Sequence, residues 1–343
     1  MRFTQAAACL ATVAIAGFGA VAPAAARSAS PAPGAARAVN GCVTPTATIP
    51  VGNSPSAAVA DPKTNTIYVA NTIAGGVSVI SARTNTVTAT IPVVRFPEGI
   101  AADLKTNTIY ATGAFDNAVS VISARTNTVT ATIPVGDQPG GVAVDPKTDT
   151  IYTANAGDDT VSVINGHTNT VTATIPAESV ASATAITVNP KTDTIYVAGI
   201  DHNTVSVISG HTNTVTATIR VGRYPQGVAA DPKTNTIYTA NTFDNTVSVI
   251  SGRTNTVIAT IRVAARGVSP ADVAVDPKTD TVYVADFAGN TFSVINGQTN
   301  TVTANISLAS PVGIALDPKT KTVYVTNSTY PSGSVSVLGP CPK

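Results

Sequence analysis

The chain has 343 residues, of which 11% are charged, and its formal net charge is +1. This small net charge excludes functions that depend on a strong positive electrostatic field, such as non-specific attraction to nucleic acid or to anionic membrane surfaces. Only three cysteines are present, and two of them lie close to the ends of the segment that the repeats below occupy.

The first residues are typical of a secretory signal peptide. Arg2 precedes an alanine-rich apolar run over 6–22, and small residues at 24–26 suit a cleavage site. We predict a signal peptide over 1–26 and a secreted, extracellular protein; a signal anchor is the alternative for this run. The small, proline-containing residues 27–41 predict a flexible segment, and no later segment predicts a membrane span.

One motif then recurs through the chain. Asp-Pro-Lys-Thr-Asn-Thr-Ile-Tyr-Val-Ala-Asn occupies 61–71. Related copies begin at Asp103, Asp145, Asn189, Asp231, Asp276 and Asp317, at steps of 42, 42, 44, 42, 45 and 41 residues. Seven copies at a period of about 40 residues indicate a repeat architecture.

Each copy predicts four short strands. In the first copy these are 57–60, 66–71, 76–81 and 86–91, which are rich in β-branched residues or alternate between apolar and polar residues. The segments between them carry turn residues such as Asp-Pro and Asn. Four strands repeated seven times without helical periodicity predict an all-β chain, folded over 42–343 as a seven-bladed β-propeller with four antiparallel strands per blade.

The second strand of the motif also resembles a known family. Ile-Tyr-Val-Ala-Asn at 67–71, Ile-Tyr-Thr-Ala-Asn at 151–155 and 237–241, and Val-Tyr-Val-Thr-Asn at 323–327 resemble the YVTN-type β-propeller repeat, over roughly 46–338. Leu104, Asn189 and Gly199 depart from the motif. The resemblance implies the propeller fold and no particular activity, because propellers host unrelated functions.

The ends of the chain predict how the ring closes. The last copy lacks a fourth strand, whereas 46–51 matches the fourth strand at 88–93, so the N-terminal strand should complete the last blade. In this register Cys341 takes the place of Arg83 and Cys42 that of Thr84, which are neighbours in one turn. We therefore predict a Cys42–Cys341 disulfide, formed in an oxidising compartment.

Comparison of the copies predicts where a ligand binds. The turns between strands one and two and between strands three and four barely change, whereas the loops on the opposite side of the disc differ from copy to copy. Neutral drift of exposed loops is one explanation, and a binding surface is the other. The expected binding residues are Arg95, Phe96, Phe115, Asp116, Asp158, Asp201, Tyr224, Phe243, Asp244, Asp286 and Phe287.

The chemistry of these loops favours an organic ligand. Aromatic rings with carboxylates suit a cationic or aromatic amine, although solvated acids and locally packed aromatics would give the same composition. An extracellular protein is the other expected partner. We expect no cofactor and no metal, because no cluster has metal-ligand spacing, and we expect a monomer.

Catalytic signals are weak. His202, beside Asp201, is a candidate general base, and Glu98 and Glu178 are candidate acid or base groups. No nucleophile elbow is present. A binding propeller without catalysis is therefore the first hypothesis, and a lactonase-like, lyase-like or amine-condensing propeller enzyme is the alternative.

Overall fold

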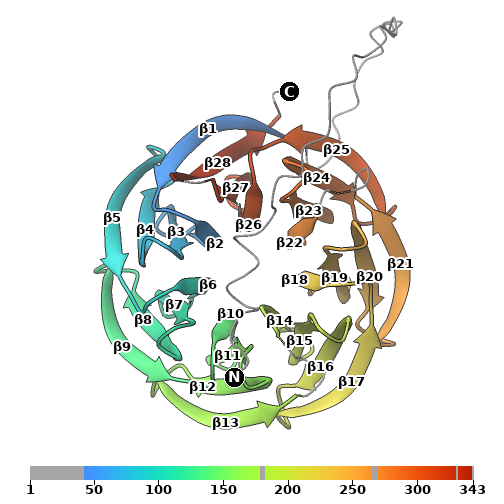
Figure 1. Cartoon of the computed structure of the whole chain (residues 1–343), viewed down its shortest axis with the longest axis horizontal. Helices are drawn as coiled ribbons and strands as arrows, with labels where there is room; N and C mark the ends of the chain where they lie inside the picture. Colours follow the sequence, from blue (N-terminus) through green and yellow to red (C-terminus); the bar gives the residue numbers. More distant parts are fainter. Residues whose placement is uncertain (1–41, 178–181, 264–266, 268, 330, 342–343) are drawn as a thin grey trace, which may run out of the picture. The chain divides into compact units, whose positions relative to one another are not determined.

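The chain is a seven-bladed β-propeller, as predicted. The computed structural model describes residues 42–177, 182–263, 267, 269–329 and 331–341. These residues form seven four-stranded antiparallel sheets and no helix. The sheets stand as blades around one axis, with the first strand of each blade innermost (Figure 1).

Six blades are each formed by four consecutive strands, which follow one another from the axis outward. Blade 1 contains β2 (Pro55–Asp61), β3 (Thr66–Asn71), β4 (Gly76–Ser81) and β5 (Thr86–Pro92). Blade 2 contains β6 (Pro97–Asp103), β7 (Thr108–Gly113), β8 (Ala118–Ser123) and β9 (Thr128–Pro134). Blade 3 contains β10 (Pro139–Asp145), β11 (Thr150–Asn155), β12 (Thr160–Asn165) and β13 (Thr170–Pro176).

The remaining blades follow the same order. Blade 4 contains β14 (Ala185–Asn189), β15 (Thr194–Gly199), β16 (Thr204–Ser209) and β17 (Thr214–Arg220). Blade 5 contains β18 (Pro225–Asp231), β19 (Thr236–Asn241), β20 (Thr246–Ser251) and β21 (Thr256–Arg262). Blade 6 contains β22 (Pro270–Asp276), β23 (Thr281–Asp286), β24 (Thr291–Asn296) and β25 (Thr301–Ser307). Blade 7 combines β26 (Pro311–Asp317), β27 (Thr322–Asn327) and β28 (Gly333–Pro340) with β1 (Val43–Val51).

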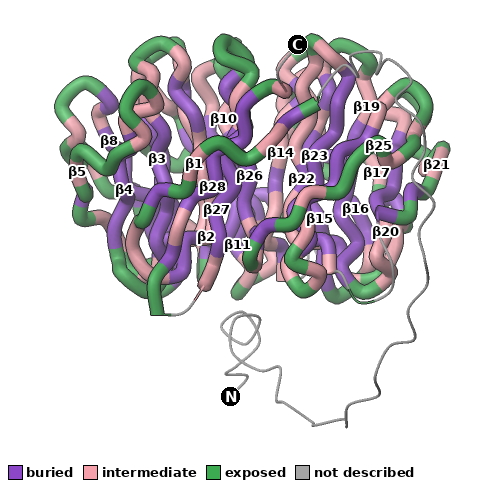
Figure 2. Tube along the Cα trace, turned by 90° about the horizontal axis from the view of Figure 1, so that it is seen from above, coloured by how far each residue is buried: buried purple, intermediate pink, exposed green. Residues whose placement is uncertain are grey.

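The hydrophobic core lies between neighbouring blades. One cluster joins Tyr68, Val79 and Ile91 of blade 1 to Ile100 and Ile109 of blade 2, and similar clusters fill other blade interfaces. The middle strands therefore bury side chains on both of their faces, and Figure 2 shows them as the buried layer of the ring. This explains why strands such as β3 have an almost unbroken apolar sequence.

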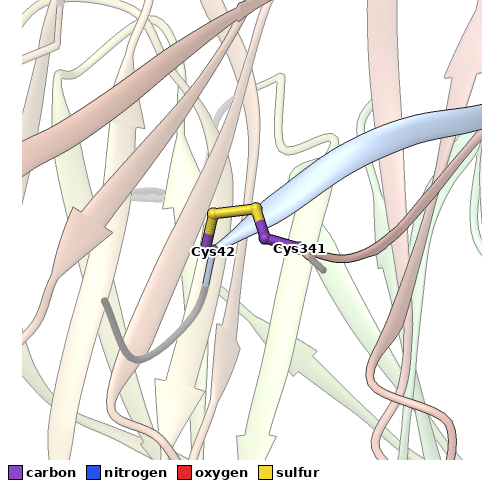
Figure 3. The surroundings of a disulfide bond; sticks show 2 residues. All are labelled: Cys42 and Cys341. Carbon is purple, nitrogen blue, oxygen red and sulfur yellow. A yellow bond between two sulfur atoms is a disulfide. The ribbon is translucent and has the colours of Figure 1, made fainter. Parts of the chain in front are cut away.

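The ring closes as the cysteine register predicts. β1 pairs antiparallel with β28, from Val43 opposite Pro340 to Val51 opposite Gly333. Just beyond this ladder a disulfide joins Cys42 to Cys341, whose Cα atoms lie 5.5 Å apart (Figure 3). The pairing removes two open sheet edges, and the disulfide stands where the other blades have a continuous turn between their two outer strands.

The two sides of the disc differ in their connections. We call the side with the β2–β3 and β4–β5 turns, and their equivalents, the constant face. We call the opposite side, which carries the β3–β4 turns and the connections from each outer strand to the next inner strand, the variable face. On the constant face the Asp61 carboxylate accepts the backbone N–H of Lys63 at 2.9 Å, and Asn65 has a left-handed φ of 54°. The turns there serve the fold.

The predicted signal peptide (1–26) and flexible segment (27–41) lie outside the described residues. Within the described part of the chain, no helix has the length and apolarity needed to cross a membrane. The disulfide fits an extracellular location, because such bonds persist in oxidising compartments.

Candidate ligand-binding face

The loops of the variable face share one backbone design. Each connection between blades contains a residue with left-handed φ: Ser54, Phe96, Gln138, Ser182, Tyr224, Ser269 and Ser310. Most of these residues donate their backbone N–H to a side chain at the end of a neighbouring turn; Gln138 donates to Asn117 at 3.0 Å, and Tyr224 donates to Asn203 at 2.8 Å. At this one position the connections therefore differ in side chain but share a left-handed backbone geometry.

In blade 2 four of the predicted binding residues form one unit. The Asp116 carboxylate accepts the backbone N–H and the Nε–H of Arg95, both at 2.7 Å, and forms an ion pair with the same guanidinium. Beside this pair, Phe96 stacks on Phe115 with ring centroids 4.4 Å apart and an interplanar angle of 14°. Phe115 remains 57% exposed, so one face of the stack is open to solvent.

Blade 5 repeats the unit. Asp244 accepts the backbone N–H and the Nε–H of Arg223 at 2.7 Å, and Tyr224 stacks on Phe243 with centroids 4.3 Å apart. Phe243 is 58% exposed. Arg95 and Arg223 hold the pKa of Asp116 and of Asp244 below the usual value, mainly through the hydrogen bond from the backbone N–H of each Arg and to a smaller extent through its side chain. Both carboxylates are thus already occupied and are poor partners for a ligand cation.

The two stacks are built on strained backbone. Phe96 has φ 57° and Tyr224 has φ 60°, where other blades use Ser or Gln. Left-handed geometry costs a bulky residue about 1–2 kcal/mol. Because the equivalent residue of every blade has this φ, the conformation belongs to the fold, and the feature particular to blades 2 and 5 is the aromatic ring placed on it.

The other predicted binding residues have partners of their own. Asp158 accepts the backbone N–H of Asp137 and the hydroxyl of Thr160, and Asp201 accepts the hydroxyl of Ser182. Asp286 is fully buried and accepts the Ser293 hydroxyl at 2.6 Å; burial raises its pKa to about 6. Phe287, the next residue, is partly buried.

The three candidate catalytic residues differ in where the structure places them. His202 is exposed in the β15–β16 turn and forms no hydrogen bond with Asp201 in the described chain. Glu178 lies outside the described residues. Glu98 is the second residue of the innermost strand β6 and is half-buried.

Glu98 is anchored by its backbone and not by its carboxylate. Ser56 donates its hydroxyl to the Glu98 carbonyl at 2.8 Å, and the next N–H, that of Gly99, is bound by Thr112 at 2.8 Å. The carboxylate itself has no hydrogen-bond or ion-pair partner among the described residues. Burial alone raises the pKa of Glu98 to about 7, since no neighbouring charge contributes.

Blade 5 provides a neutral counterpart of Glu98. Gln226 occupies the same strand position, and its Oε1 accepts the hydroxyl of Thr242 at 2.8 Å. In blade 2 the residue that corresponds to Thr242 is Ala114, which has no hydroxyl. The absence of a hydroxyl at this place is why Glu98 lacks the partner that Gln226 has.

Asp272 is a further partly buried acid that is not among the predicted binding residues. It is the third residue of β22, where the other innermost strands carry Ala or Gly at the same place, and that difference was a usable signal. Its carboxylate accepts the backbone N–H groups of Val273 and Ile314, and burial raises its pKa to about 6. Asp272 therefore joins the inner strands of blades 6 and 7.

No group of three or more His, Cys, Asp or Glu residues in the described chain is arranged to hold a metal ion.

The comparisons with known proteins support the fold. No protein-family model and no curated protein matches the chain. Among solved structures, a chain of hydrazine synthase from Kuenenia stuttgartiensis is similar, with a TM-score of 0.74 and 17% sequence identity over 83% of this chain and 95% of that chain. At this identity the likeness shows the propeller fold alone, and membership of the YVTN family stays a prediction.

Proposed function

We propose that this chain is a secreted ligand-binding propeller, which takes a small organic molecule with an aromatic or cationic group on its variable face. One observation carries the proposal: the paired units of blades 2 and 5, each with an exposed, rigid aromatic ring. An aromatic face of this kind attracts flat rings and organic cations. The left-handed φ at this position recurs in every blade, but only blades 2 and 5 place an aromatic ring there, where the other blades have Ser or Gln, so the rings are not needed for the fold.

The rings are also fixed before a ligand arrives. Each stack is bracketed by an Arg–Asp pair that joins the inter-blade loop to the adjacent turn. A preorganised surface loses little side-chain entropy on binding, which favours affinity.

The test compares ring removal with a matched control. Phe115→Ala together with Phe243→Ala should weaken binding of benzylammonium and of its neutral analogue benzyl alcohol by about tenfold, the loss expected when aromatic contacts disappear. Ile73→Ala is the control, because Ile73 has the same place in blade 1, is 55% exposed and has no ring to stack on. Saturation-transfer NMR measures the binding of both probes to the wild type and to each variant. Equal losses in the control, or none in the double variant, would reject the proposal.

A propeller enzyme on the same face is the second candidate, and Glu98 is the observation that favours it. A carboxyl with a pKa of about 7 can exchange protons with a substrate near neutral pH. Turnover that disappears in Glu98→Gln while substrate binding persists would select the enzyme over the binding protein.

A further inference from the structure

We infer that Glu98 is the anchor for the positively charged group of the ligand, so that the ligand is an organic ammonium ion whose binding displaces a proton. This inference rests on the proposed function and adds to it a charge, a residue and a pH dependence. The aromatic units alone require none of these.

The first argument is that the Glu98 carboxylate has no hydrogen-bond or ion-pair partner among the described residues, whereas six other acids of the inner strands and the variable face have one. Asp116 and Asp244 are neutralised by arginines, and Asp158 and Asp201 accept hydrogen bonds from the loops around them. Asp272 and Asp286 accept backbone or serine donors. A desolvated carboxylate without a donor is costly, and this cost makes it a favourable partner for an incoming cation.

The second argument is the arrangement around the carboxylate. Oε2 of Glu98 lies 3.5 Å from the place where a Cβ on Gly140 would stand, and Gly140 has the same position in blade 3 as Glu98 has in blade 2. A glycine there leaves the carboxylate clear of a neighbouring side chain. The backbone around it is fixed by Ser56 and Thr112, so the acid is presented from a rigid strand rather than from a mobile loop.

The third argument is the comparison with blade 5. The segments Arg95-Phe96-Pro97-Glu98 and Arg223-Tyr224-Pro225-Gln226 are equivalent, and both carry the Arg–Asp pair and the aromatic stack. Only the blade 2 segment ends in an acid, and only there is the supporting hydroxyl replaced by Ala114. The molecule thus holds one charged and one neutral version of the same unit.

No charged side chain of the adjoining described strands is placed to pair with the Glu98 carboxylate in the way that a ligand cation would. β6 packs against β2, β3, β7 and β10, and the one titratable side chain of β3, Tyr68, is buried. Asp61 of β2 and Asp145 of β10, like Asp103 of β6 itself, lie at the far ends of the inner strands. That is about 16 Å from the second residue, at roughly 3.3 Å per residue. Tyr110 of β7 is buried, and Arg95 is committed to Asp116.

The pH dependence of ligand binding follows from the ionisation of Glu98. Only the ionised carboxylate attracts an ammonium ion, and the pKa of free Glu98 is raised to about 7. Below that pH the bound cation must expel a proton, so the affinity falls as the pH falls, by up to about tenfold per pH unit. A neutral ligand would show no such dependence.

The experiment uses benzylammonium and benzyl alcohol at millimolar concentrations, with the wild-type protein, Glu98→Gln and Ala114→Thr. Calorimetry in two buffers of different ionisation enthalpy counts the protons released. We expect the wild type to bind benzylammonium about tenfold more tightly than benzyl alcohol, because the ammonium group makes a charge-assisted hydrogen bond with Glu98. Binding of benzylammonium should release up to one proton near neutral pH. Glu98→Gln should bind both probes equally and release none. Ala114→Thr should fold, because Thr242 has the same place in blade 5, and should weaken only benzylammonium.

The outcomes separate the two proposals. If the wild type binds both probes equally, or if Glu98→Gln keeps the preference and the proton release, the inference is overturned while aromatic binding on the variable face stands. If neither probe binds the wild type, the proposed function fails and the inference fails with it.

Discussion

Removing the disulfide should cost the propeller a measurable part of its stability. Cys42 and Cys341 are separated by 299 residues, so the bond constrains almost the whole described chain in the unfolded state. For a loop of that length the chain-entropy relation gives about 5.7 kcal/mol as an upper bound, because residual structure in the unfolded chain reduces the effect. The β1–β28 ladder remains in place when the bond is absent, so the ring still closes.

We therefore expect Cys42→Ser with Cys341→Ser to fold and to lose about 2–5 kcal/mol of unfolding free energy. Urea denaturation followed by circular dichroism measures the loss, with the wild type under reducing conditions as a second comparison. The two samples should agree with each other. A double variant within about 0.5 kcal/mol of the oxidised wild type, the scatter of surface substitutions, would refute the reasoning.

Three further variants test the account of the inner strands and loops. Asp286→Asn, which installs the residue found at Asn71, Asn155, Asn241 and Asn327, should stabilise the protein near pH 8 by up to about 3 kcal/mol and have no effect near pH 4. The sign follows because a raised pKa favours the native state below the unfolded-state value and loses that contribution as the pH rises through about 6; equal effects at both pH values would contradict it. Thr112→Ala should cost about 1–3 kcal/mol in chemical denaturation, because it leaves the Gly99 N–H and the Gly140 carbonyl unpaired, and a neutral result would show that neither bond matters. Phe96→Asn should leave the melting temperature nearly unchanged, since relief of the left-handed strain offsets the lost stack, while binding of benzyl alcohol weakens; a large fall in melting temperature would mean that the stack serves stability instead.

Most of the fold was predictable because the copies could be compared with one another. The strands β3 and β4 begin and end where the β-branched pattern predicts, and the match between 46–51 and 88–93 gave both the strand exchange and the Cys42–Cys341 bond. The outermost and innermost strands extend one or two residues beyond the predicted segments, because backbone pairing continues through Pro55 and Pro92. Residue patterns alone do not show where such pairing ends.

The chemistry of the variable face was only partly predictable. The aromatic and acidic residues were recognised, but their pairing depends on contacts between neighbouring loops, such as Arg95 with Asp116, 21 residues apart. The isolation of Glu98 depends on the absence of a hydroxyl at Ala114, which matters only because blade 5 places Thr242 against Gln226. Position-by-position comparison of blades 2 and 5 contains this signal, although its meaning required the three-dimensional register.

The most direct test of the charged anchor is the titration of Glu98 itself. The chain contains only two glutamates, Glu98 and Glu178, so selective carboxyl labelling with carbon-13 gives a simple NMR spectrum that Glu98→Gln assigns. We predict that the Glu98 resonance titrates with a pKa of about 7 in the free protein and that saturating benzylammonium lowers this pKa by about one unit or more. A Glu98 resonance that titrates at its ordinary value, or whose pKa benzylammonium leaves unchanged, would contradict the account.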